Sequence, residues 1–200
     1  MKAAKTDKKT VINNLKKTLR QGDIIFTSIG GPLFRRIASS TGSWTSHVGM
    51  VLKGKNGEWL VAESKVPFSR FSTLESFVGR SIGSQVATRR IKRSLSDEEI
   101  SLLRKSAEKR MGKIYDFSYD INNSKSQYCS KFVYEVYREA LNIEIGSNES
   151  FSELYAKFPQ MPLTFWKLWY LGRIPWEMHT VTPASQFNDE SLDDVFQHIA

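Results

Sequence analysis

The hydrophobic pattern in the first half of the chain predicts a short helix followed by several strands. From Thr10, apolar residues recur at helical spacing with basic side chains on the other side, which is typical of a short amphipathic helix. Such a helix either caps a domain or lies on a membrane surface, and we favour the cap. Short apolar runs between turn residues predict strands at 22–27, 47–52, 58–63 and 85–92, with helical turns after Pro32 and over 72–79.

The second half of the chain has mainly helical patterns. Ser96 and Glu99 have the spacing of a capping box ahead of an apolar stripe, and Gly112 follows at the end of that helix. A second helix is predicted over residues 129–141, and a third begins at Ser150. Because the strands come first and most helices come later, the order predicts the α+β class.

Length and composition predict one domain with two charged ends. Of the 200 residues, 40% are hydrophobic and 12% are aromatic, which is enough for a packed core. Residues 1–20 hold seven Lys or Arg and one Asp, whereas residues 186–200 hold four Asp or Glu and no Lys or Arg. We therefore expect a basic tail with a short helix over 1–20, a single domain over 21–185, and an acidic tail over 186–200.

Aromatic side chains are concentrated near the C-terminal end of this domain. The stretch 158–176 contains Lys167 and Arg173 as its charged residues. We interpret residues 157–185 as a cover that packs over the domain, because apolar residues in 164–172 have helical spacing. An apolar wall or lid for a lipid substrate, or a surface that touches a membrane, is the alternative.

Composition and pattern exclude several classes of protein. The net charge of +8 comes without a recognisable nucleic-acid-binding motif, so we predict no nucleic-acid partner. No apolar run approaches the ~18 residues of a membrane span, and the N-terminus lacks the apolar core of a secretory signal, which favours a cytoplasmic protein. One cysteine and three widely separated histidines offer neither a disulfide nor a metal-binding spacing, so no metal is predicted.

Cys129 is a candidate nucleophile because it stands at the first turn of the predicted helix 129–141. Unpaired backbone N–H groups and the helix dipole favour an anion at that position, so they stabilise a thiolate and offer donors to an oxyanion. On position alone the alternative stays open, because a lone cysteine is usually a small buried hydrophobic residue.

His47 and Glu63 supply the partners that a nucleophilic cysteine needs. A five-residue loop over 53–57 sets His47 directly opposite Glu63 on the next strand, where the carboxylate holds one imidazole nitrogen and leaves the other for a thiol. A two-residue turn in the same loop would instead place Val66 opposite His47. We favour the five-residue loop, because the apolar neighbours of Glu63 indicate burial.

Four short segments, taken in order, resemble a known enzyme family. They are Gly22-Asp23-Ile24-Ile25-Phe26, Ser46-His47-Val48-Gly49-Met50-Val51, Val61-Ala62-Glu63 and Tyr128-Cys129-Ser130-Lys131-Phe132-Val133. Their order and spacing are similar to the permuted papain-like amidases, the YiiX/YebB-like branch of the NlpC-type cysteine peptidase superfamily. His47 precedes Cys129, as expected of a circularly permuted chain. The likeness extends to Thr180-Val181-Thr182-Pro183 and looks closest to the YebB-like members.

The resemblance implies a circularly permuted papain-like fold, in which an antiparallel sheet or half-barrel packs against helices. It implies Cys129 as the nucleophile, His47 as general base and acid, and Glu63 as the group that orients the imidazole. The residues expected to line the substrate pocket are Tyr115, Tyr128 and Ser46.

The implied reaction is attack of a cysteine thiolate on a carbonyl, followed by release of a thioester intermediate to water or a second acceptor. It requires no metal and no organic cofactor. The resemblance favours a peptide or cell-wall-type amide as substrate. The first alternative is a lipid acyl hydrolase or acyltransferase of the lecithin–retinol acyltransferase-like type, and the second is a non-catalytic ligand-binding module. The expected partner is a small-molecule, peptide or lipid substrate; a peripheral membrane contact is left open, and no obligate protein partner is implied.

Overall fold

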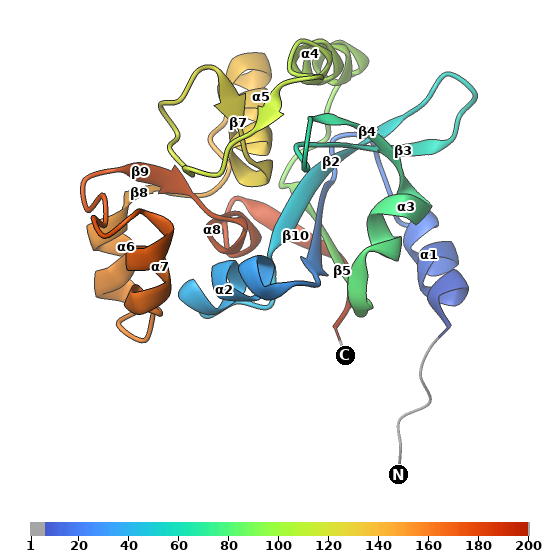
Figure 1. The fold of residues 1–200 in the computed structure, drawn as a ribbon. Helices are drawn as coiled ribbons and strands as arrows, with labels where there is room; N and C mark the ends of the chain where they lie inside the picture. Colours follow the sequence, from blue (N-terminus) through green and yellow to red (C-terminus); the bar gives the residue numbers. More distant parts are fainter. Residues whose placement is uncertain (1–6, 200) are drawn as a thin grey trace.

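An antiparallel sheet of six strands forms the centre of the molecule (Figure 1). The structure is a computed structural model and describes residues 7–199. The strands lie in the order β10-β5-β1-β2-β3-β4, and each neighbouring pair is antiparallel. Their bounds are β1 (Ile24–Ile29), β2 (His47–Lys53), β3 (Trp59–Glu63), β4 (Arg70–Thr73), β5 (Ser81–Ile91) and β10 (Leu192–His198). Two smaller pairs join β6 (Ile114–Tyr115) to β7 (Ser126–Gln127) and β8 (Asn148–Ser150) to β9 (His179–Val181).

Helices cover both faces of the sheet. One face packs against α1 (Lys8–Lys16) and α3 (Leu74–Gly79), and the other packs against α4 (Asp97–Glu108) and α5 (Cys129–Leu141). The remaining helices are α2 (Pro32–Ser40), α6 (Phe151–Lys157), α7 (Leu163–Trp169) and α8 (Pro183–Phe187). Within residues 7–199, no helix has the length and apolar character needed to cross a bilayer. The predicted α+β class with an antiparallel sheet is confirmed.

The apolar side of α1 is buried inside the molecule. Val11, Ile12 and Leu15 are buried with Ile25 of β1 and Val51 of β2 in one cluster. This helix therefore caps one face of the sheet, as we favoured, and its apolar stripe is not available to a membrane. Residues 1–6 of the expected basic tail lie outside the described residues.

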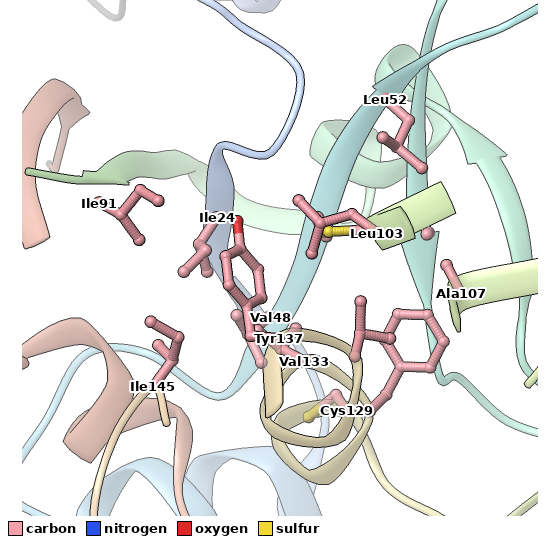
Figure 2. Close-up of a cluster of buried hydrophobic side chains, with 14 of the residues drawn as sticks. Ile24, Val48, Leu52, Ile91, Leu103, Ala107, Cys129, Val133, Tyr137 and Ile145 are labelled. Carbon is pink, nitrogen blue, oxygen red and sulfur yellow. The ribbon is translucent and has the colours of Figure 1, made fainter. Parts of the chain in front are cut away.

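The opposite face of the sheet and α5 enclose the main core (Figure 2). Val48 and Leu52 of β2 belong to one buried cluster with Val133 and Tyr137 of α5. Alternate residues of a strand point to opposite faces, so the strands supply both cores at once. Cys129 lies at the start of α5, at one end of this cluster, and the packing of the helix fixes its position.

The C-terminal segment differs from the acidic tail that its composition predicts over 186–200. Its second half is the edge strand β10, in which Asp193 and Asp194 pair with Arg90 and Arg89 of β5. Arg89 also forms an ion pair of 3.1 Å with Asp194. The acidic residues therefore lie opposite a basic strand, where unlike charges stabilise the pairing, and the sheet extends beyond the boundary expected at residue 185.

Candidate active site

Cys129 is the first residue of α5, at the position that the sequence predicts. The helix begins there because Tyr128 is extended, with φ −109° and ψ 172°, whereas the next three turns pack their apolar side against the sheet. The thiol is buried, with 4% of the residue exposed. The N–H groups of the first helical turn have no partner inside the helix, so they and the dipole favour negative charge beside the sulfur.

His47 begins β2, and its ring is held by Glu63 at the end of β3. The His47 Nε2 and Glu63 Oε2 atoms are 2.5 Å apart, and both side chains are buried. A carboxylate at one nitrogen fixes the orientation of the ring and leaves Nδ1 for another partner. The structure thus brings together the histidine and the acid proposed from the sequence.

The strand register predicted for this hairpin is wrong by two residues. Met50 pairs with Ala62 and Lys53 pairs with Trp59, so Glu63 lies diagonally from His47 rather than opposite it. The loop is one residue further along than predicted, because Lys53 stays in the strand with its ammonium 3.6 Å from the Trp59 ring centroid. Side chains two residues apart on a strand share a face, which is why the contact still forms.

Two residues that the sequence analysis missed also bind the carboxylate of Glu63. Ser72 Oγ donates to Glu63 Oε1 at 2.6 Å, and Arg80 Nη2 donates to both carboxylate oxygens at 2.6 Å. Burial raises the pKa of Glu63, but the hydrogen bond and charge of His47 and the charge of Arg80 outweigh it and lower the pKa to about 2. The carboxylate is therefore charged at neutral pH. Arg80 follows α3 and had no sequence pattern that linked it to Glu63.

The remaining surroundings of His47 explain its state of protonation. Its ring centroid is 5.4 Å from that of Phe77. Gly49 has no room for a side chain, because a Cβ there would lie 2.5 Å from Val61 Cγ1 and 3.3 Å from the Phe77 ring. Nδ1 is buried without a partner at hydrogen-bond geometry. Burial lowers the pKa of His47, but Cys129 and then Glu63 outweigh burial and raise the pKa to about 9. A protonated imidazole next to a cysteine is the pairing that activated cysteine nucleophiles use.

A pocket with a volume of about 60 Å³ adjoins the sulfur. Its lining includes Cys129 and the three residues predicted to contact the substrate: Ser46, Tyr115 and Tyr128. The other walls are mostly aromatic or aliphatic. Ile37, Tyr119 and Phe151 come from parts of the chain that the sequence analysis did not assign to the site. Met161, Trp166 and Met178 belong to the segment 157–185, for which a pocket wall was the alternative interpretation. No Lys, Arg, Asp or Glu is among the described residues that line the pocket.

The predicted pocket residues have different polar partners. Tyr128 OH lies 2.8 Å from Thr180 Oγ1 and also accepts the N–H of Val181, so it joins α5 to β9. Ser46 Oγ accepts the N–H of Ile29. Burial, the charge of Cys129 and neighbouring Tyr119 raise the pKa of Tyr115 well above its usual value, so its phenol stays protonated.

The aromatic segment 158–176 both packs and lines the pocket. Trp166 is buried and donates from Nε1 to Ser40 Oγ at 2.8 Å, and Trp169 donates to the carbonyl of Phe117. These bonds make the segment a cover, as we favoured. Because Trp166 and Tyr170 also line the pocket, the cover forms one of its walls.

The comparisons with known proteins agree with this arrangement. The sequence pattern of the permuted papain-like amidase family C92, which includes YaeF and YiiX, matches residues 18–196. The chain belongs to this family. A member in Escherichia coli strain K12, the uncharacterized protein YiiX, is 30% identical over 174 residues, covering 87% of this chain and 84% of that protein. The permuted papain-like resemblance is thus confirmed, and the narrower likeness to YebB-like members stays a prediction.

A solved structure in the same family has the same fold. The crystal structure of metalloprotein yiiX from Escherichia coli O157:H7 is 28% identical, with a TM-score of 0.84 over 92% of this chain and 99% of that one. In the described part of this chain, no three His, Cys, Asp or Glu side chains gather as a metal site requires. Nε2 of His47 is bonded to Glu63, which leaves His47 Nδ1 and the Cys129 thiol as the atoms of these side chains that could ligate a metal ion. This donor set does not fit a resident metal ion.

Proposed function

We propose that the protein is a cysteine hydrolase that cleaves an amide of peptide or cell-wall type. Cys129 acts as nucleophile, His47 as general acid and base, and Glu63 as the group that orients the ring. The observation that carries this proposal is the 2.5 Å contact between His47 Nε2 and Glu63 Oε2, which holds a buried ring whose pKa Cys129 raises. Membership of a permuted papain-like amidase family supports the same class of chemistry.

The proposed reaction has two stages. The Cys129 thiolate attacks the carbonyl carbon, and backbone N–H groups at the start of α5 stabilise the tetrahedral oxyanion. His47 gives its Nδ1 proton to the leaving nitrogen, so the C–N bond breaks and a thioester and a free amine result. Water then loses a proton to His47 and attacks the thioester, which releases the acid and restores the thiolate.

A lipid acyl hydrolase or acyltransferase with the same nucleophile is the second candidate. The pocket beside Cys129 has aromatic and aliphatic walls, and no charged residue lines it in the described part of the chain. Burial of an unpaired charge is costly, so such walls favour an uncharged, apolar acyl group. An amide and an ester of that acyl group both pass through the same thioester.

Activity of the wild type and Cys129→Ala on matched amide and ester substrates tests the proposal. Each pair shares one apolar acyl group and differs in the leaving amine or alcohol, with a peptide amide and a phospholipid added as natural-type substrates. We expect amide cleavage that Cys129→Ala abolishes and that His47→Ala reduces by about 10²-fold or more. The matched control is His198→Ala on β10. Cleavage of esters alone supports the second candidate, and no cleavage of either class overturns both.

A further inference from the structure

The outer faces of α2 and α7 combine exposed apolar side chains with basic ones. Leu168 and Leu171 are 79% and 94% exposed, the largest exposed fractions among the described large hydrophobic residues. The basic residues exposed on the same two elements and the turn after α7 are Arg35, Arg36, Lys167 and Arg173. We call these six residues the docking face. In the described residues none of its four cations takes part in an ion pair of 4 Å or less.

The two elements form one surface. The Arg36 guanidinium carbon lies 5.9 Å from the Phe165 ring centroid, and Trp166 of α7 donates to Ser40 of α2. Figure 1 shows α2 and α7 near each other and on the other side of the sheet from α1. The basic residues of the docking face are therefore separate from those of α1.

Leu171 stands in a conformation that a leucine rarely adopts. Its φ is +51°, a left-handed region that favours Gly or Asn, and the Gly172 that follows also has a positive φ of 94°. The turn leaves the leucine side chain almost wholly in solvent. Within the protein this arrangement gains little apolar burial, which points to burial against something else.

The charge of this surface selects the partner. The sequence contains no Asp or Glu in α2 or in residues 158–176, while Arg35, Arg36, Lys167 and Arg173 supply four positive charges. Exposed apolar side chains flanked by Lys and Arg suit the interface of a bilayer with negatively charged headgroups. We propose that the docking face binds the surface of an anionic lipid bilayer, with Leu168 and Leu171 entering the headgroup region.

The docking face is also close to the pocket. Ile37 on α2 and Trp166 on α7 line the pocket, so one pair of helices carries the pocket on its inner side and the basic, apolar surface on its outer side. Docking would hold the pocket near the bilayer. The binding step itself does not depend on the cysteine hydrolase chemistry, and the two proposals fail separately.

Sedimentation with phosphatidylcholine vesicles, with and without phosphatidylglycerol, tests the proposal on the full chain. We expect binding to the anionic vesicles at low salt and its loss near 1 M salt, where the Debye length falls to about 3 Å. Lys167→Gln with Arg173→Gln is expected to weaken partitioning roughly tenfold or more, since each basic residue near an anionic surface contributes about fivefold. Leu168→Ser with Leu171→Asn is expected to weaken it as well, and Asn suits the positive φ.

Two controls make the result decisive. Leu102→Ser with Lys105→Gln changes an exposed leucine and an exposed lysine on α4, away from the docking face, and should leave binding unchanged. Lys8→Gln with Lys9→Gln tests α1. The proposal is overturned if the protein does not bind anionic vesicles, or if the docking-face variants bind as well as the wild type. It is also overturned if the α1 variant loses binding, or if a second copy of the chain occupies the docking face in solution. Cys129→Ala should bind vesicles as the wild type does.

Discussion

Arg80 donates from a single nitrogen, Nη2, to both carboxylate oxygens of Glu63, at 2.6 Å each. The same guanidinium lies 5.4 Å from the centroid of the Phe77 ring, which in turn lies beside His47. Arg80 therefore holds the acid that orients the imidazole. This makes it a positioning residue whose effect should appear in the pH dependence of the site.

Replacement of Arg80 by Gln is expected to raise the pKa of Glu63, because a nearby positive charge no longer favours the carboxylate. The acid limb of the pH profile, where the alkylation rate of Cys129 falls at low pH, should then move to higher pH by about one unit or more. Arg80→Lys keeps the charge and should restore most of the wild-type profile. Arg35→Gln, at an exposed arginine on α2, is the matched control. The measurement is the alkylation rate of Cys129 from pH 3 to pH 7. Identical acid limbs in all four proteins would exclude a positioning role for Arg80.

The buried His47–Glu63 pair predicts how stability depends on pH. The pKa of Glu63 is lowered to about 2. Its contribution to the free energy of unfolding is therefore full above about pH 4.5 and is lost as the pH falls toward 2. The pKa of His47 is raised to about 9. Its contribution to the free energy of unfolding is therefore full below about pH 6.5 and is lost as the pH rises through 9.

Urea unfolding of the wild type and of the His47→Gln, Glu63→Gln double variant measures this contribution. The difference in unfolding free energy between them should be largest between about pH 4.5 and 6.5 and should shrink on both sides. Subtracting the unfolding free energy of the double variant from that of the wild type cancels the contribution of groups that titrate elsewhere. A difference that stays constant from pH 3 to pH 9 would show that the pair does not titrate as described.

Asp23 should prove structural. It is buried and accepts hydrogen bonds from Arg90 at 2.6 and 2.8 Å and from the N–H of Arg20 at 2.7 Å, so it joins the segment after α1 to β5. Asp23→Ala leaves a partly buried arginine unpaired and is expected to lower the unfolding free energy by about 3 kcal/mol. Glu190→Ala, at an exposed acidic residue in the turn before β10, should change it by less than about 0.5 kcal/mol. Equal effects of the two changes in urea titrations would contradict the assignment.

The pocket predicts selection against charge. Because its described lining holds no Lys, Arg, Asp or Glu, an acyl group that ends in a carboxylate has no partner there. We expect kcat/KM to be roughly 100-fold lower for a carboxylate-bearing acyl group than for an apolar one of equal length. Comparable values for the two substrates would mean that the acyl group binds elsewhere.

Local patterns in the sequence predicted the elements that carry the site. Helix α5 was predicted with its observed bounds, because Phe132, Val133, Val136, Tyr137 and Ala140 recur at helical spacing. The hairpin was predicted with a shifted register, because the sequence does not fix where the loop begins, and Lys53 remains in the strand opposite Trp59. His47 and Glu63 met in spite of the shift, since a move of two residues preserves the face of a strand.

Other features depend on partners that are distant in the sequence. β10 was taken as a tail because its acidic residues gain their strand partners from β5, about a hundred residues earlier. Arg80 reaches Glu63 only when α3 has packed on the sheet. The pocket walls Tyr119, Trp166 and Met178 come from separate loops and helices, so no local motif shows that they meet.

Alkylation of Cys129 by iodoacetamide, followed by mass spectrometry across pH, tests the central arrangement most directly, because it needs no substrate. If His47 and Glu63 hold the thiolate ready, the wild type should react rapidly at pH 6 to 7, and His47→Ala should react at least about tenfold more slowly there. His179→Ala should match the wild type. A Cys129 that reacts only above pH ~8, like an ordinary thiol, or that reacts equally well in His47→Ala, would contradict the account.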